Sequence, residues 1–207
     1  GTVRHHFSKL SMASLEAEAN RVLATYALKA LPRRRLKAAV DLTFIPYHGR
    51  WARRSRELRR GRAKHGTGWF HAYASAYVML QGRRFTLAVK YVRRGESYAG
   101  VVAYLLRRVE RLGVRVSCLY LDRQFYRIDI INLLKAKGIA FLMPVICRGR
   151  SGGMRHLLQA KRSYTTMYTM RNPVKRTEAS FQVHVVKVYL KRRYGKRGSL
   201  CYGYAFH

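Results

Sequence analysis

Two apolar stretches give the clearest signals along the chain, and each carries one aspartate. Residues 36–46 alternate with the two-residue period of a pleated strand, which places Asp41 on the face opposite the larger apolar side chains. Residues 115–122 form a second apolar strand pattern that ends in Asp122. A carboxylate on a half-buried strand is costly unless a cation compensates it. Each aspartate therefore has a structural and a metal-binding interpretation. The structural role is a salt bridge or, for Asp122, the formation of a turn, and the alternative for both residues is a metal ligand.

Helical periodicity predicts three helices around these strands. The first lies within residues 1–34 and is capped by Ser14. Its predicted apolar stripe consists of Leu15, Ala19, Val22, Leu23 and Tyr26. The second, over 97–113, has a continuous apolar stripe, and the third spans about 128–137. Gly113 and Gly138 follow the last two as stop signals.

The remaining β-prone runs complete an α/β pattern. Residues 69–92 predict a hairpin that turns at Gln81-Gly82, and 140–145 predict a strand after the third helix. The order β-β-β-α-β-α-β is typical of a mixed sheet flanked by helices. Beyond residue 146 the sequence predicts a short helical piece and then a β-rich region, whose β-prone runs are 164–170, 181–190 and 200–206.

The charge of the chain limits the classes of molecule that it could bind. Its 207 residues include 43 Lys+Arg against 9 Asp+Glu, a formal net charge of +34, while 48% hydrophobic content is enough to bury a core. Such a surface repels itself unless a polyanion neutralises it, and nucleic acid is the leading candidate. An anionic membrane is the alternative, but the sequence has no apolar run of about 18 residues and no signal-peptide pattern.

Residues 47–67 predict a loop crowded with cations, directly after the strand that bears Asp41. A merely solvated loop is the simpler interpretation, but so many like charges repel one another, which favours a surface that follows phosphates. The candidate DNA-binding residues are Arg50, Arg53, Arg54, Arg56, Arg59, Arg60, Arg62 and Lys64, with Arg123 beside the second acid. The cysteines, Cys118, Cys147 and Cys201, are too widely spaced for a ligand pair and predict buried free thiols in a reducing cytoplasm.

The segments 41–49 (DLTFIPYHG) and 121–126 (LDRQFY) resemble the first two catalytic segments of insertion-sequence DDE transposases, and 130–144 is similar to the helix and strand that follow the second Asp in that family. The resemblance implies a ribonuclease-H-like catalytic core over 35–145. It implies an N-terminal helical segment over 1–34 and a β-rich insertion over 146–207. Asp41 and Asp122 would then be the first two catalytic, metal-binding acids.

The family also has a third carboxylate, a Glu on a helix beyond the β-rich insertion. The sequence contains no such helix before His207, so we expect the chain to be truncated and catalysis to be incomplete in it. Glu178 is a weak candidate for this third carboxylate, because it opens a strand within a basic turn and does not lie on a helix.

The activity implied by the resemblance is two-metal phosphoryl transfer at transposon ends with Mg²⁺ or Mn²⁺. The implied partners are transposon-end and target DNA, with a homodimer on the DNA allowed and a cytoplasmic, nucleoid-associated location expected. Two alternatives stay open. One is a nucleic-acid-binding fragment without catalysis, which the absent third acid favours. The other is a related ribonuclease-H-like nuclease that uses the same acids.

Overall fold

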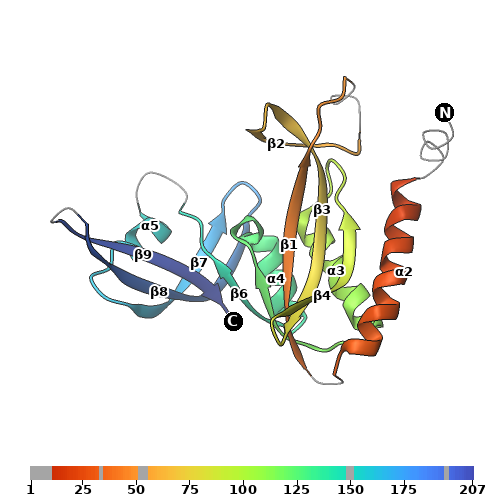
Figure 1. Ribbon diagram of the computed structural model, residues 1–207. Helices are drawn as coiled ribbons and strands as arrows, with labels where there is room; N and C mark the ends of the chain where they lie inside the picture. The colour runs from red at the N-terminus through yellow and green to blue at the C-terminus, as the bar shows by residue number, and fades with distance from the viewer. Residues whose placement is uncertain (1–10, 33–34, 51–55, 148–151, 194–195) are drawn as a thin grey trace. The chain divides into compact units, whose positions relative to one another are not determined.

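The computed structural model describes residues 11–32, 35–50, 56–147, 152–193 and 196–207. The chain divides into two compact units, Gly1–Ser117 and Cys118–His207, and each is described by itself. Both units combine a β-sheet with helices, which confirms the predicted α/β class (Figure 1). The division falls within a strand, β5, whereas the sequence-based boundaries at 34/35 and 145/146 stay predictions.

The first unit is built on an antiparallel sheet whose central strand is β3 (Thr67–Leu80). Strand β1 (Leu36–Pro46) pairs with it on one side and β4 (Arg83–Tyr91) on the other. The β3–β4 turn is Gln81-Gly82, with φ of 50° and 75°. Two successive positive φ values are what a tight two-residue hairpin turn requires. The predicted 69–92 hairpin is therefore confirmed.

The predicted loop over 47–67 is wrong in part, because residues 59–64 form a strand, β2 (Arg59–Lys64). It pairs antiparallel with the start of β3 through a second tight turn at His65-Gly66, with φ of 50° and 77°. Its sequence carries no apolar alternation, since nearly all of the strand is exposed. Backbone pairing with β3 holds it in place, and its cations suit an exposed edge.

Helix α3 (Tyr98–Arg111) confirms the second predicted helix. Ser97 caps it by accepting a hydrogen bond from the Gly100 N–H at 3.1 Å. The predicted stripe is buried, as Val101, Val102, Leu105, Leu106 and Val109. Gly113 follows with a φ of 71°, a conformation that glycine adopts at little cost.

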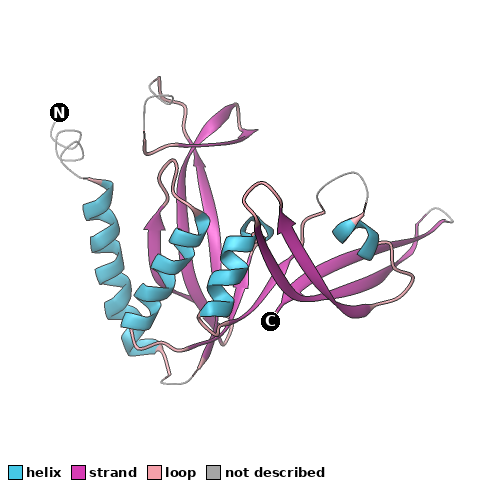
Figure 2. Cartoon of the chain, turned by 180° about the vertical axis from the view of Figure 1, so that it is seen from behind, coloured by secondary structure: helices cyan, strands magenta, loops and turns pink. Residues whose placement is uncertain are grey.

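Helix α2 (Met12–Ala30) differs from its prediction in cap and in orientation. Ser11, not Ser14, is the cap, and its Oγ accepts a hydrogen bond from the Ser14 N–H at 3.0 Å. Much of the predicted apolar stripe is exposed, with Tyr26 at 72%, whereas Asn20 is only 1% exposed. The helix runs alongside β4 (Figures 1 and 2). The side chains through which it bonds to this strand, Glu16 and Asn20, are polar.

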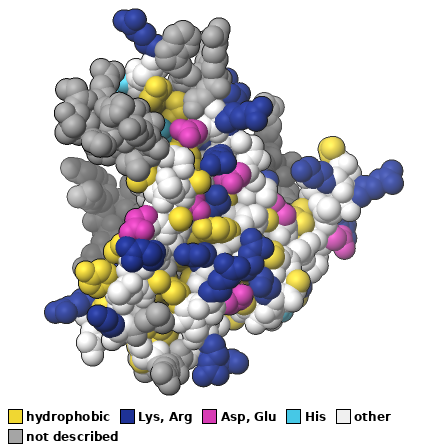
Figure 3. All heavy atoms as spheres, turned by 90° about the vertical axis from the view of Figure 1, so that its right-hand side faces the viewer, with side chains coloured by type: hydrophobic (Ala, Val, Ile, Leu, Met, Phe, Trp, Pro, Cys, Tyr) yellow, Lys and Arg dark blue, Asp and Glu magenta, His cyan; other side chains and the backbone are white. Residues whose placement is uncertain are grey.

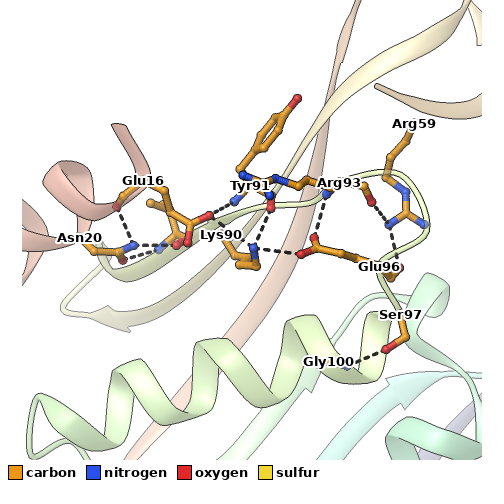
Figure 4. Close-up of polar contacts among 10 residues, drawn as sticks. Glu16, Asn20, Arg59, Lys90, Tyr91, Arg93, Glu96, Ser97 and Gly100 are labelled. Atoms are coloured by element: carbon orange, nitrogen blue, oxygen red, sulfur yellow. Dashed lines mark hydrogen bonds and ion pairs between the residues drawn. The ribbon is translucent and has the colours of Figure 1, made fainter. Parts of the chain in front are cut away.

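The reason for this orientation is the backbone of β4, whose outer edge would otherwise leave unpaired amides. Asn20 supplies both halves of a missing strand pair: its Nδ2 donates to the Val89 C=O and its Oδ1 accepts from the Val89 N–H, both at 2.9 Å. Glu16 accepts from the Tyr91 N–H at 2.7 Å (Figure 4). Side chains of α2 thus stand in for a neighbouring strand.

The second unit contains a mixed sheet. Strand β5 (Val116–Leu121) runs parallel to β6 (Ala140–Pro144), which pairs antiparallel with β9 (Lys196–Phe206). The long strand β8 (Thr177–Arg193) lies between β9 and β7 (Tyr164–Asn172). The predicted strand at 140–145 and the three later β-prone runs are thus strands. That β7–β9 are an insertion into a ribonuclease-H-like core stays a prediction.

One face of this second sheet carries the core of the unit. The short helix η1 (Arg123–Phe125), α4 (Ile128–Ala136) and α5 (Gly153–Leu157) supply its apolar side chains. Tyr126 meets Phe181 edge-on, with ring centroids 5.8 Å apart. Gly203 permits the closest approach, because a Cβ there would lie 2.6 Å from a methyl carbon of Val145. The third predicted helix is confirmed as α4.

Candidate catalytic acids and nucleic-acid interface

Asp41 lies in the middle of β1 and is half-buried. Its Oδ1 accepts a hydrogen bond from the Leu42 N–H at 2.9 Å. Across the ladder it faces Ser75 of β3, whose hydroxyl accepts from Arg84 at 2.9 Å. The Arg84 guanidinium also lies over the Tyr77 ring, 3.8 Å from its centroid. Arg84 is thus held by Ser75 and Tyr77 and forms no ion pair with Asp41.

Asp122 follows β5 directly and is exposed. Its side chain accepts a hydrogen bond from the Arg123 N–H, and its C=O accepts from the Phe125 N–H at 3.0 Å, so it also caps η1. The turn-forming role that the sequence allowed is therefore real. The hydrogen bond from the Arg123 N–H uses one carboxylate oxygen of Asp122 and leaves the other for a ligand.

The other acidic residues have partners. Five form ion pairs: Glu16 and Glu96 with Lys90, Glu18 with Arg21, Asp129 with Arg127, and Glu178 with Arg171. Glu57 and Glu110 also interact with other groups. Within the described ranges, Asp41 and Asp122 are the two acids whose carboxylates meet only a neighbouring backbone N–H. In so cationic a chain, two acids left without a cation partner are unexpected.

The donor chemistry of both residues fits a hard divalent cation. Mg²⁺ takes oxygen ligands, commonly one or two carboxylates together with water and phosphate oxygens. Among the described residues no group of three His, Cys, Asp or Glu side chains is placed to hold a metal ion. Asp41 belongs to the first unit and Asp122 to the second, so a shared ion stays a prediction.

Most of the predicted DNA-binding residues that the structure describes are exposed cations, and Arg59 is half-buried. Arg50, Arg56, Arg60, Arg62, Lys64 and Arg123 are exposed. Arg53 and Arg54 lie outside the described residues. The face shown in Figure 3 carries many Lys and Arg side chains with acids set among them.

Arg59 differs from the other cations of β2 because it is half-buried and engaged within its own unit. It donates to the Glu96 C=O at 3.2 Å (Figure 4). Its guanidinium also lies over the Tyr98 ring, 4.7 Å from the centroid. Arg59 thereby ties β2 to the loop before α3. It positions the exposed cations of the strand, a role that no local sequence pattern indicates.

A half-buried cluster around Lys90 was also missed by sequence reasoning. Lys90 pairs with Glu16 at 3.6 Å and with Glu96 at 3.2 Å (Figure 4). Its ammonium lies 5.2 Å from the centroid of the Tyr104 ring. Burial, together with the hydrogen bond to Glu16, raises the pKa of Tyr104 to about 12. Burial likewise raises the pKa of Tyr73 and of Tyr91, and the Tyr91 hydroxyl donates to the Glu57 C=O.

Fold and site together define a strongly basic α/β protein in which two aspartates meet no cation partner within the described part of the chain. No protein-family model and no curated protein matches the chain. Among solved structures it is similar to a chain of a piggyBac transposase synaptic complex with hairpin DNA, with 14% sequence identity and a TM-score of 0.44. The match covers 82% of this chain and 33% of that one, so this chain spans about a third of its length. A likeness at this level leaves the function to be argued from the residues.

Proposed function

We propose that this chain belongs to the catalytic part of a DNA transposase, with a ribonuclease-H-like core that supplies two of the acids for metal-dependent strand cleavage and strand transfer at transposon ends. The observation that carries the proposal is the state of Asp41 and Asp122. They are the two acids without a cation partner among the described residues, and both stand in segments that resemble the first catalytic segments of DDE transposases.

In this proposal Asp41 and Asp122 hold Mg²⁺, or Mn²⁺ in its place, with their free carboxylate oxygens. Bound divalent ions would activate the attacking water or 3′-hydroxyl and stabilise the leaving oxygen. The exposed cations of β2 (Arg60, Arg62 and Lys64) bind the DNA backbone, where Lys and Arg position the duplex without reading its bases. The net charge of +34 supports a polyanionic partner.

The direct test is Mg²⁺-dependent cleavage of end-sequence DNA by Asp41→Asn and Asp122→Asn. We expect each to lose about 10²-fold or more of its activity, because a metal ligand supports several kcal/mol of transition-state stabilisation. Asp129→Asn is the matched control, since Asp129 is exposed and paired with Arg127 at 3.3 Å. Equal cleavage by all three variants would contradict the assigned roles.

A second test needs no enzymatic turnover. Fe²⁺ replaces Mg²⁺ at oxygen sites and, with ascorbate and peroxide, generates hydroxyl radicals that cut the nearby polypeptide. If Asp41 and Asp122 hold one ion, cuts should appear near both residues, excess Mg²⁺ should suppress them, and either Asn variant should remove both sets. Cuts confined to one of the two segments would refute a shared ion.

One observation favours a second candidate function, a DNA-binding fragment without catalysis: among the described residues no group of three His, Cys, Asp or Glu side chains is placed to hold a metal ion. Glu178, the substitute considered from sequence, is paired with Arg171 at 3.2 Å. This candidate predicts salt-sensitive DNA binding with no metal dependence. A nuclease that uses the same acids would release hydrolysed ends and form no joined strand-transfer product.

A further inference from the structure

Strand β9 carries a row of aromatic side chains along one face. Residues two apart point to the same side of a strand, so Tyr202, Tyr204 and Phe206 share a face. Tyr202 is 46% exposed, and Tyr204 and Phe206 are half-buried. These partly accessible rings contrast with Phe141 and Phe181 of the same sheet, which are buried.

The neighbouring strands continue this face with small polar groups. Across the ladder, Tyr204 faces His184, which in turn faces Thr165 of β7. Phe206 faces Gln182, and Gln182 faces Met167. His184, Gln182 and Thr165 are all exposed, and Thr165 bonds His184 at 2.8 Å. We call the surface made by Thr165, Met167, Gln182, His184, Tyr202, Tyr204 and Phe206 the β7–β9 face.

The opposite face of the same strands is covered. Phe181, Val183 and Val185 of β8 are buried there. The segment after α5 also crosses it: Lys187 Nζ donates to the Ala160 C=O at 3.0 Å, and Gly203 lies against Leu158. No described helix of this unit covers the β7–β9 face, so its aromatic residues are not part of the core of the unit.

The chemistry of the unit indicates which partner suits this face. Residues 118–207 contain 18 Lys and Arg against 3 Asp and Glu, so another copy of the chain would be repelled and a polyanion attracted. A duplex hides its base faces, whereas unpaired bases expose a π-face that stacks on Tyr and Phe side chains. Gln and His between the rings can hydrogen-bond base edges.

We propose that the β7–β9 face binds single-stranded DNA, with successive bases stacked on Tyr202, Tyr204 and Phe206. The proposal deepens the proposed function, since it takes DNA as the partner, and it adds a site for unpaired bases that is separate in sequence from Asp41 and from β2. Backbone phosphates contribute through the general positive field, and the stacked rings contribute a part of the affinity that salt does not screen.

The test measures the binding of a fluorescent oligothymidine of about 12 nucleotides to the full chain. Tyr202→Ala and Phe206→Ala should each raise the Kd by about 5- to 100-fold, the loss expected for one stacked base. Tyr189→Ala is the matched control, because Tyr189 is 72% exposed on the opposite face of β8 and should bind normally. Kd values that match this control would overturn the proposal.

Tyr202→Trp and Tyr202→Leu separate stacking from folding. Both keep a large apolar side chain, yet Trp should preserve or tighten binding and Leu should weaken it. A 2-aminopurine base in the oligomer should be quenched by the wild type and by Tyr202→Trp, and much less by Tyr202→Leu. If Leu and Trp bind alike, stacking is refuted, and an RNA oligomer that binds more tightly than DNA would overturn the assignment to DNA.

A failure of the single-stranded DNA site can be distinguished from a failure of the transposase proposal. Asp41→Asn should bind the oligothymidine as the wild type does, even where it has lost cleavage. Tyr202→Ala should bind a short duplex as the wild type does. If oligothymidine binding depends on Tyr202 while no variant or wild type cleaves DNA, the β7–β9 face stands and the transposase proposal falls.

Discussion

Asn20 occupies a place that an apolar residue would ordinarily fill, with 1% of its surface exposed. It remains there because its amide is fully engaged: Nδ2 donates to the C=O groups of Glu16 and Val89, and Oδ1 accepts from the Val89 N–H. A buried polar group costs little when it is paired and much when it is not. At the scale of single residues, Asn20 therefore decides how α2 is held.

We expect Asn20→Ala to lower the free energy of unfolding by about 2–4 kcal/mol, because it leaves the Val89 N–H and C=O unpaired at a half-buried strand edge. Urea denaturation measures this loss. Thr25→Ala is the control on the exposed side of α2 and should stay within about 0.5 kcal/mol of the wild type. A loss of similar size in both variants would show that the edge pairing is unimportant.

Tyr104 gives a pH dependence at the same scale. Its pKa is raised to about 12, chiefly by burial, from an ordinary value of about 10. Between these two values the unfolded chain releases a proton that the folded chain keeps, so the free energy of unfolding falls as pH rises and the contribution is intact below about pH 10.

Tyr104→Phe has no proton to release, so its stability should decline less steeply than that of the wild type over this alkaline window. Urea denaturation at a series of pH values gives the two slopes. Tyr26→Phe, at an exposed position of α2, should follow the wild type. Parallel curves for Tyr104→Phe and wild type would mean that the phenol is not held in its neutral form.

At the scale of elements, two tight turns fix the antiparallel sheet of the first unit. Gln81-Gly82 joins β3 to β4, and His65-Gly66 joins β2 to β3, with positive φ at all four residues. The first turn sets the register that places Arg84 close enough to bond Ser75, across the ladder from Asp41. Turn geometry thereby helps to bring Arg84 to the cross-strand neighbour of the candidate catalytic acid.

Gly82→Ala should destabilise the first unit by about 1 kcal/mol, because a φ of 75° is unfavourable once a Cβ is present. A Cβ at Gly82 meets nothing within 4 Å, so the cost is conformational and not steric. Gly68→Ala is the control, with an ordinary 3.5 Å contact. Thermal unfolding of both variants measures the difference, and an equal shift in Tm would argue against turn strain.

At the scale of the whole molecule, the charge of +34 governs association. Phosphate contacts release counterions, so the logarithm of the DNA-binding constant falls with the logarithm of salt concentration by about 0.9 per contact. If Arg60, Arg62 and Lys64 of β2 bind phosphates, replacing all three with Gln should reduce this slope by about 2–3. Duplex binding over a salt series gives the slope.

The matched control removes the same charge elsewhere in the first unit, through Arg83→Gln, Arg107→Gln and Arg111→Gln, all at exposed positions. It should change the slope less than the β2 variant does. Equal changes would mean that DNA binding responds to net charge alone and that β2 is not a distinct binding element.

No helix among the described residues has the length and apolarity to cross a membrane.

The strands and helices with strong local patterns could be predicted from sequence. The apolar and polar residues of β1 alternate, and α3 carries five buried residues at helical spacing. Gln81-Gly82 marks the turn of the β3–β4 hairpin. The prediction placed the helix α2 but gave it the wrong buried side, and it missed the strand β2, because both elements are held by backbone groups of a neighbouring strand. α2 meets the edge of β4 through Glu16 and Asn20, and β2 pairs with β3 while its side chains face solvent.

The sequence by itself determined the basic character of the protein, its α/β order and the positions of Asp41 and Asp122 within and after strands, because period, turn residues and charge are local properties. Only the tertiary structure decided that these two acids meet no cation among the described residues, that Arg59 is structural, and that the aromatic row of β9 stays open. Each of these depends on which distant segments pack together. Burial and pairing are settled between elements, and no single stretch of sequence contains both partners.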